Sequence, residues 1–205
     1  MILTTFVEPP LDNNNYLLVN DASKEALLID CSCYDEKLVK GLAEQNITLK
    51  YILLTHAHFD HVLGVEKTVQ ATGAKVVLHQ DDLDLLNNLN AYSFMLGLPE
   101  VNVPKVDILV RDGDAIRLGD KEIKVIHTPG HTLGGVSYLF EEMLFSGDTL
   151  FQESVGRTDL EGGSFATLED SIRNRIFMLA DNVTVYPGHG PKTSVGHEKK
   201  FNSYI

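Results

Sequence analysis

The chain has 205 residues, 43% of them hydrophobic and 22% charged, which is the composition of a globular protein long enough for one sizeable core. Acidic residues outnumber basic ones by 29 to 17, and the net charge is −12. Because nucleic acids and anionic membrane surfaces are bound mainly through Lys and Arg, this balance argues against both as partners. We expect a single domain over residues 1–205.

The N-terminal segment has neither the basic start nor the small-residue cleavage site of a secretion signal. No apolar run reaches the roughly 18 residues that a membrane-spanning helix needs. We therefore expect a cytoplasmic protein. Cys31 and Cys33 are too close together for an ordinary structural disulfide, and two thiols alone cannot complete a zinc site, so we expect free thiols.

The first half of the chain is predicted to alternate strands and helices. Short apolar runs between turn-forming residues predict strands over residues 2–7, 16–20, 25–30, 51–55 and 75–79, with Asn13 and Asn14 in a turn. Apolar residues four positions apart predict a helix over 35–45. A second helix is predicted over 62–72, with Gly73 as its end.

The second half is richer in hairpins. Residues 81–98 are predicted to mix helix and loop and to cover the core. Strands are predicted over residues 114–118, 121–129, 136–140, 143–147 and within 183–190. A last helix is predicted from about Thr167, which could cap it with Asp170 three positions on. This order favours an α/β fold in which two mixed sheets are covered by helices on the outside.

The stretch "THAHFDH", residues 55–61, places three histidines and an aspartate directly after a predicted buried strand. His56 and His58 are two positions apart, so in a non-helical turn their side chains point the same way and could bind one ion. Asp60 and His61 could then bind a neighbouring ion. A lone histidine after a strand would more often be structural, but this cluster indicates metal binding.

Three further candidate ligands lie beside glycines. They are His131 in "HTPGHT", Asp148 in "FSGDTLF" and His189 in "YPGHGP". Each follows a strand that runs into a tight glycine turn, which aims the side chain at one edge of a sheet. The remaining histidines are assigned no ligand role: His79 is expected to end a strand, His127 to pack or hydrogen-bond below the site, and His197 to lie on the surface.

This residue set resembles the metallo-β-lactamase superfamily over nearly the whole chain. The His-x-His-x-Asp-His motif is complete, and the later His, Asp and His follow in the family's order. The segments "GDTLFQESVGRTDLEGG" and "YPGHGPKTSVGHEKKFN" are similar to a short branch of glyoxalase II-like hydrolases that lacks a C-terminal helical domain. The resemblance implies an αββα sandwich.

The resemblance also implies two metal sites. The first ion would be held by His56, His58 and His131, the second by Asp60, His61 and His189, with Asp148 bridging both. The ions would be divalent, with zinc expected and iron or manganese as alternatives. Hydroxide from a shared water would attack the carbonyl of a small thioester such as S-lactoylglutathione. The implied catalytic residues are Asp60, His61 and Asp148.

Other activities of the superfamily remain open on the sequence. Persulfide dioxygenases share the motif and a Gly-Arg-Thr-Asp stretch like residues 156–159, and their single iron would here be held by His56, His131 and Asp148. A lactonase-type ester hydrolase is a further alternative. The zinc β-lactamases usually carry Cys where this chain has Asp148, which argues against that activity.

Substrate recognition is assigned to one residue, since a basic residue stands at this position in glyoxalase II. Arg157 is expected to contact an anionic part of the substrate. Its alternative role is an ion pair with Asp159 or Glu161. The oligomeric state is not indicated by the sequence.

Overall fold

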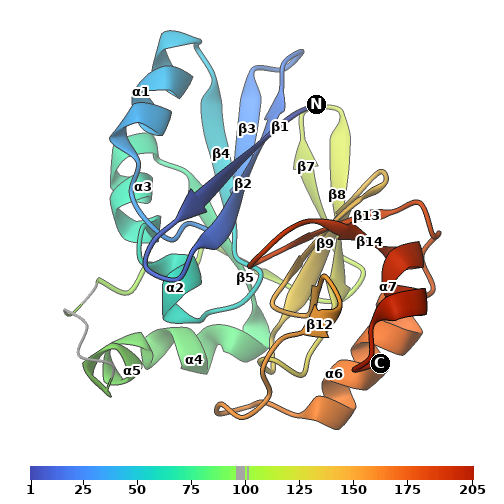
Figure 1. The fold of residues 1–205 in the computed structure, drawn as a ribbon. Coiled ribbons are helices and arrows are strands. Elements are labelled where there is room, and N and C mark those ends of the chain that lie inside the picture. Colours follow the sequence, from blue (N-terminus) through green and yellow to red (C-terminus); the bar gives the residue numbers. More distant parts are fainter. Residues whose placement is uncertain (96–99, 101) are drawn as a thin grey trace.

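The computed structural model describes residues 1–95, 100 and 102–205. Two six-stranded sheets pack face to face, with helices on their outer faces (Figure 1). The first sheet follows chain order: β1 Ile2–Glu8, β2 Asn13–Asn20, β3 Glu25–Ile29, β4 Thr48–Leu53, β5 Lys75–His79 and β6 Ile108–Val110. Its strands pair antiparallel from β1 to β3 and parallel from β3 to β6.

The second sheet is formed by the C-terminal half of the chain. Its order is β14 Thr193–Ser194, β13 Thr184–Pro187, β10 Met143–Gly147, β9 Val136–Phe140, β8 Lys121–His127 and β7 Ala115–Leu118. Only β10 and β13 pair in parallel within it, and all other neighbours are antiparallel. A short ribbon of β11 Leu150–Phe151 and β12 Ser154–Val155 stands beside this sheet.

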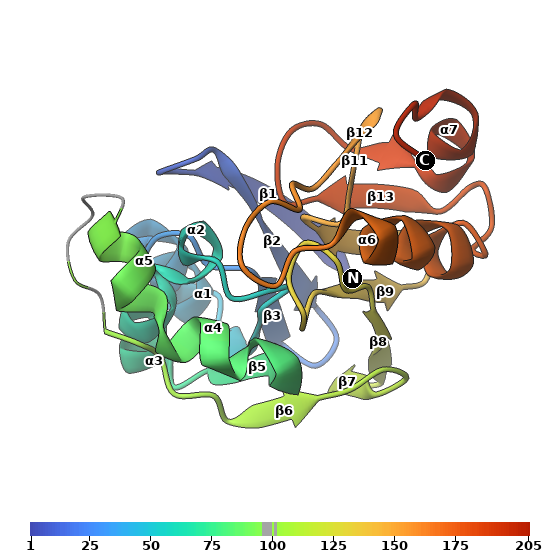
Figure 2. The same cartoon turned by 90° about the horizontal axis from the view of Figure 1, so that it is seen from below.

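The helices lie outside the sheets. They are α1 Glu36–Glu44, α2 Phe59–Val62, α3 Val65–Thr72, the 3-10 turn η1 Gln80–Asp82, α4 Leu83–Asn87, α5 Leu89–Met95, α6 Phe165–Ser171, the π-helical turn η2 Ile172–Ile176 and α7 Val195–Phe201. Figures 1 and 2 show α1 and α3 on the first sheet, and α6 and α7 on the second. The predicted αββα sandwich is confirmed.

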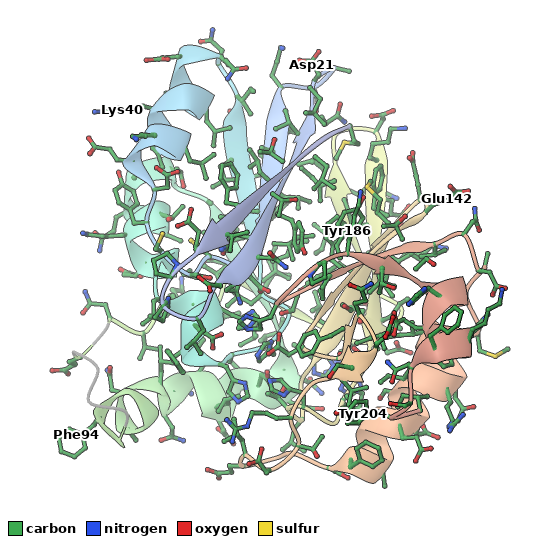
Figure 3. All side chains as sticks on the ribbon, viewed as in Figure 1. Asp21, Lys40, Phe94, Glu142, Tyr186 and Tyr204 are labelled. Carbon is green, nitrogen blue, oxygen red and sulfur yellow. The ribbon has the colours of Figure 1, made fainter. Side chains whose placement is uncertain are left out.

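Three apolar layers hold these elements together. In the parallel strands, alternate residues point to opposite faces, so Leu27 packs between the two sheets while Leu28 packs toward the helices of the first sheet. The layer between the sheets also contains Tyr186, which packs against Tyr16 and Phe145 (Figure 3). Each fully buried aliphatic side chain stabilises the fold by about 1.5–3 kcal/mol.

Several predicted boundaries are wrong, and each has a local cause. Asn13 and Asn14 begin β2 and form no turn, because the Asn14 amide donates to the carbonyl of Pro187 and pairs the strand end with the second sheet. The predicted helix 62–72 is two pieces that meet at Gly64. A side chain there would meet the backbone of Cys33 at 2.2 Å.

At the last predicted helix, Ser164 is the cap and its hydroxyl accepts from the Thr167 amide, so capping by Thr167 was wrong. Helix α7 was not predicted at all. Of the range 81–98, residues 96–98 lie outside the described part of the chain. Within the described residues, no helix is long and apolar enough to cross a membrane.

Candidate metal centre

The candidate ligands converge where one edge of the first sheet meets the second. Strand β4 runs into residues 54–58, and a hydrogen bond from the Val136 amide to the Thr55 carbonyl, 2.9 Å, joins the two sheets there. Strands β10 and β13 are parallel, so Asp148 and His189 leave the second sheet at the same edge. The loop after β8 brings His131 to the same place.

The first cluster consists of His56, His58 and His131, whose ligand atoms lie within 4.8 Å of one another. His58 Nδ1 and His131 Nε2 are 2.8 Å apart. Burial, reinforced by the neighbouring imidazoles, lowers the pKa of His58 to about 3 and that of His56 well below its ordinary value. Both rings are therefore neutral at pH 7, which is the form that binds metal ions.

The second cluster consists of Asp60, His61 and His189. His189 Nε2 lies 3.1 Å and His61 Nε2 lies 3.5 Å from Asp60 Oδ2. Burial acts to raise the pKa of Asp60, but the facing imidazoles of His61 and His189 outweigh it and hold the pKa below its ordinary value. The carboxylate is thus ionised at neutral pH.

Asp148 lies between the two clusters. Its Oδ1 is 3.5 Å from His61 Nε2, and its Oδ2 is 3.5 Å from His131 Nε2 and 3.6 Å from His189 Nε2. Asp148 Oδ1 and His56 Nε2 are buried without a hydrogen-bond partner among the described residues. Such atoms are rare in folded proteins and call for a partner. Their position in a set of His and Asp donors fits a pair of divalent ions.

Surrounding groups fix which nitrogen each ring presents to the centre. His131 Nδ1 donates to the carbonyl of Arg157 at 2.7 Å, and His189 Nδ1 donates to the carbonyl of Leu11 at 3.1 Å. Because a carbonyl can only accept, both rings must leave Nε2 free to face the centre. This arrangement is typical of metal-binding histidines.

His61 is held by Asp30, a residue that the sequence analysis did not single out. Asp30 Oδ2 lies 2.8 Å from His61 Nδ1, and Asp30 also accepts from the amide and hydroxyl of Thr55. Burial acts to lower the pKa of His61, but the carboxylates of Asp30, Asp60 and Asp148 raise it to about 10. The only sequence signal for Asp30 was an aspartate at the end of a buried strand.

Asp82 was also missed, and it connects the two loops that carry His58 and His131. Its Oδ2 accepts from the Ala57 amide and the Thr132 hydroxyl, both at 3.0 Å, and its Oδ1 accepts from the Gly134 amide at 2.6 Å. No local pattern marked it, because all three donors lie at least 25 residues away along the chain.

The other predicted positions lie away from this centre. His79 ends β5 as expected, and His127 stacks on it with ring centroids 4.2 Å apart and a 13° angle between planes. With Asp81 they form another group of possible ligands, but in-plane lone pairs of parallel rings cannot converge on one ion. His197, on α7, pairs with Glu153, and both cysteines are free.

A cavity of about 740 Å³ opens over the centre. Its floor includes the ligand candidates His58, Asp60, His131, Asp148 and His189. Arg157 lies at its rim and forms a two-point ion pair with Asp159, with Nε–Oδ1 2.7 Å and Nη2–Oδ2 2.8 Å. The expected alternative role of Arg157 is therefore seen, while its contact with substrate stays a prediction.

Comparison with known proteins places the chain in a family. Residues 9–189 match the model of the metallo-β-lactamase superfamily. The chain is 34% identical over 200 residues to the probable metallo-hydrolase YqgX of Bacillus subtilis, covering 96% of this chain and 93% of the relative. It is 33% identical over 195 residues to the hydroxyacylglutathione hydrolase GloC of Haemophilus influenzae, covering 93% and 92%.

Solved structures agree with this placement. The BLEG-1 B3 metallo-β-lactamase superimposes with a TM-score of 0.90 at 38% identity, covering 99% of both chains. TTHA1623, solved in a di-iron-bound form, superimposes with a TM-score of 0.86 at 34% identity, covering 98% of this chain and 100% of that one. The chain belongs to the metallo-β-lactamase superfamily and is a metallo-hydrolase with a candidate binuclear centre.

Proposed function

We propose that this metallo-hydrolase cleaves a small thioester, with S-lactoylglutathione as the first substrate to test. The observation that carries the proposal is the pair of ligand clusters on either side of Asp148, on the floor of a cavity of about 740 Å³. A hydrolase needs both parts, because the centre must activate water and the cavity must hold the bond to be cleaved. The similarity to GloC supports a thioester as the substrate class.

In this proposal each cluster would hold one ion, and Asp148 would be a ligand shared by both. The first ion is assigned to His56, His58 and His131, and the second to Asp60, His61 and His189. When bound, two divalent ions would supply hydroxide at neutral pH and an electrophile for the carbonyl oxygen. No Ser or Cys nucleophile is then required, and both cysteines carry a pKa of about 12, raised first by burial.

The protein's own residues orient the reaction. The ionised carboxylate of Asp60 can accept a hydrogen bond from the attacking water and aim its lone pair at the substrate. Asp30 holds the His61 ring, so the nitrogen facing Asp148 keeps its position. Arg157, on the rim, is proposed to contact the part of the substrate that lies outside the floor.

Two other activities have specific support. His56, His131 and Asp148 would supply the two-histidine, one-carboxylate set that oxygen-activating iron uses, and TTHA1623, solved in a di-iron-bound form, shows that a similar protein binds iron, although as two ions. The resemblance to BLEG-1 raises β-lactam hydrolysis, although the sequence carries Asp148 where the zinc β-lactamases usually have Cys. Each predicts a different metal content or substrate.

The deciding experiment measures metal per chain by plasma mass spectrometry, on protein purified without added metal. The same sample is assayed with S-lactoylglutathione, with glutathione persulfide under oxygen, and with a chromogenic cephalosporin. We expect about two ions per chain and thioester cleavage. One iron with oxygen uptake would replace the proposal with a dioxygenase, and cleavage of the cephalosporin alone would replace it with a β-lactamase.

A further inference from the structure

The cavity over the candidate centre has an apolar lining and an acidic rim, where Arg157 is the one Lys or Arg among the described lining residues. We infer that the preferred substrate is a thioester whose remote part is apolar and uncharged, and that Asp159 selects against anionic thiols by neutralising Arg157. This inference rests on the proposed function and deepens it. It predicts that S-lactoylglutathione is a poorer substrate than a neutral thioester of similar size.

The apolar lining comes from both halves of the fold. Helices α2, α4 and α5 contribute on one side, and the β11–β12 ribbon with the loop after it contributes on the other (Figure 2). The apolar lining residues are Leu11, Ala57, Phe59, Leu85, Leu89, Phe151, Val155 and Leu160. Leu11 and Leu160 keep 54% and 40% of their surface exposed. An apolar group in the cavity would remove such surface from water.

The charges at the rim oppose an anionic ligand. Arg157 is the only Lys or Arg among the described lining residues, and both arms of its guanidinium are bonded to Asp159. That bonding lowers the pKa of Asp159 to about 2, so the carboxylate is ionised at neutral pH. Glu161 lines the same rim. To bind Arg157, a carboxylate on the substrate would have to displace Asp159 from it, at a rim that also carries the acidic side chain of Glu161.

Glutathione carries two carboxylates and one ammonium, and coenzyme A carries phosphates, so both thiols present net negative charge to this rim. Like charges placed together are a common means of rejecting a ligand. A neutral thiol with an aliphatic or aromatic group meets no such repulsion and gains the apolar lining. The cavity therefore favours the neutral ligand on two independent grounds.

Binding of stable thioethers tests the inference without depending on turnover. Zinc-loaded protein is titrated by calorimetry with S-hexyl-N-acetylcysteamine, which is neutral, and with S-hexylglutathione, which has the same alkyl chain. We expect the neutral ligand to bind more tightly by about fivefold or more. In a series of neutral ligands from S-butyl to S-hexyl, each added methylene should tighten binding by about two- to fourfold. Tighter binding of the glutathione ligand, or no effect of chain length, would overturn the inference.

Variants test the role of Asp159. Asp159→Asn removes the negative charge that neutralises Arg157, so S-hexylglutathione should gain about two- to fivefold in affinity relative to the neutral ligand. Adding Arg157→Ala should abolish that gain. Asp181→Asn is the matched control, since it removes one carboxylate from an exposed pair with Lys199 that does not line the cavity. An equal change in both single variants would show that net charge, and not Asp159, sets the preference.

Hydrolysis assays keep this inference separate from the proposed function. If the thioethers bind as expected and no thioester is cleaved, the proposed function fails and the ligand class stands. If S-lactoylglutathione is cleaved with a higher kcat/KM than hexanoyl-N-acetylcysteamine, the proposed function stands and the inference fails.

Discussion

At the scale of single residues, Asp148 lies between the two candidate ligand clusters, and its two oxygens face different histidines. Asp148→Asn keeps the size of the side chain, removes its charge and turns one oxygen into a donor. Since even a supporting partner of a metal ligand contributes 10–100-fold, we expect turnover to fall by at least about 100-fold. Bound metal should fall below two ions per chain, as measured by plasma mass spectrometry alongside kcat.

Circular dichroism provides the control for this variant, since the substitution should leave the sheets and helices folded. A folded Asp148→Asn protein that keeps two ions and full activity would remove Asp148 from both proposed sites. Because Asp60 and His61 are unaltered in this variant, the result reports on the bridge between the clusters.

Gly156 shows how tightly the backbone packs behind the same aspartate. A Cβ at this position would lie 1.8 Å from the carbonyl oxygen of Asp148 and 3.3 Å from His131 Nδ1. Gly156→Ala must therefore displace Asp148, and we expect a loss of about 1–3 kcal/mol in the free energy of unfolding. Turnover should fall with it, by at least about tenfold. Urea denaturation and kcat measure the two effects.

The matched control is Gly41→Ala in helix α1, where a Cβ would meet no atom within 4 Å. Replacing a helical glycine by alanine at an open site should raise the free energy of unfolding by about 0.5–1 kcal/mol. If both substitutions destabilise alike, crowding behind Asp148 is not what makes Gly156 sensitive.

The sequence predicted the residues of this centre whose chemistry marks them directly. Several histidines clustered after one buried strand, and further His and Asp residues at tight glycine turns, are typical of a metal site, so His56 and Asp148 could be named without coordinates. Asp30 and Asp82 could not. Their roles are set by donors that the fold brings from 25 or more positions away along the chain. In the sequence, an aspartate at a strand end or in a turn carries no local pattern that indicates such a role.

At the scale of elements, the turn η1 holds together the two loops that supply His58 and His131. Its Asp82 is buried and accepts from Ala57 in one loop and from Thr132 and Gly134 in the other. In Asp82→Asn an NH2 group replaces one carboxylate oxygen, so it faces at least one of these donors and cannot accept a hydrogen bond from it. We expect metal affinity to fall by about 10–100-fold, measured by competition with a chromogenic chelator.

Asp81→Asn is the control for that prediction, because it alters the neighbouring residue of the same turn, whose side chain is 47% exposed. It should leave metal affinity unchanged within about twofold, as surface substitutions away from special features usually do. Equal losses in both variants would mean that η1 affects the centre through general stability. Thermal melts of both proteins separate these cases.

Helix α7 is the element that the sequence did not predict, and its buried residues show why. Its buried residues are Val195 and Glu198, so its inner face lacks the apolar repeat by which helices are predicted. Glu198 can be buried because it accepts from the Glu153 amide, the Thr193 hydroxyl and the Asn202 amide. By contrast, α1 has a regular apolar stripe and a capping Asp35, and its prediction is confirmed to within one residue at either end.

At the scale of the whole molecule, the candidate centre links the two halves of the sandwich. The first sheet supplies the candidate ligands among residues 56–61 and Asp30, which holds His61, while the second supplies the candidate ligands His131, Asp148 and His189. Bound ions would therefore connect the sheets, and ions that bind only the folded state stabilise it. Chelation should lower the melting temperature.

The size of this effect follows from mass action. At a free metal concentration about 1,000 times the dissociation constant, one site adds about 4 kcal/mol to the free energy of unfolding. Two such sites would add about 8 kcal/mol, and each kcal/mol corresponds to about 2–4 °C for a chain of this length, so chelation should lower the melting temperature by about 16–32 °C, and zinc should restore it. Differential scanning calorimetry with and without chelator measures the change.

Two histidine variants show whether this stabilisation arises at the proposed centre. His189→Gln removes a partly exposed ligand of the second cluster, so it should reduce the chelator-induced shift by about half, since one of two sites is lost. His127→Gln alters a histidine of the other His/Asp group. The His127 ring stacks on His79, and the lone pairs of these two rings cannot converge on one ion. The shift should be unchanged in that variant. An unchanged shift in His189→Gln with a reduced one in His127→Gln would place the stabilising ion beside His79 and His127. The ligand assignment would then have to be rebuilt around these two residues.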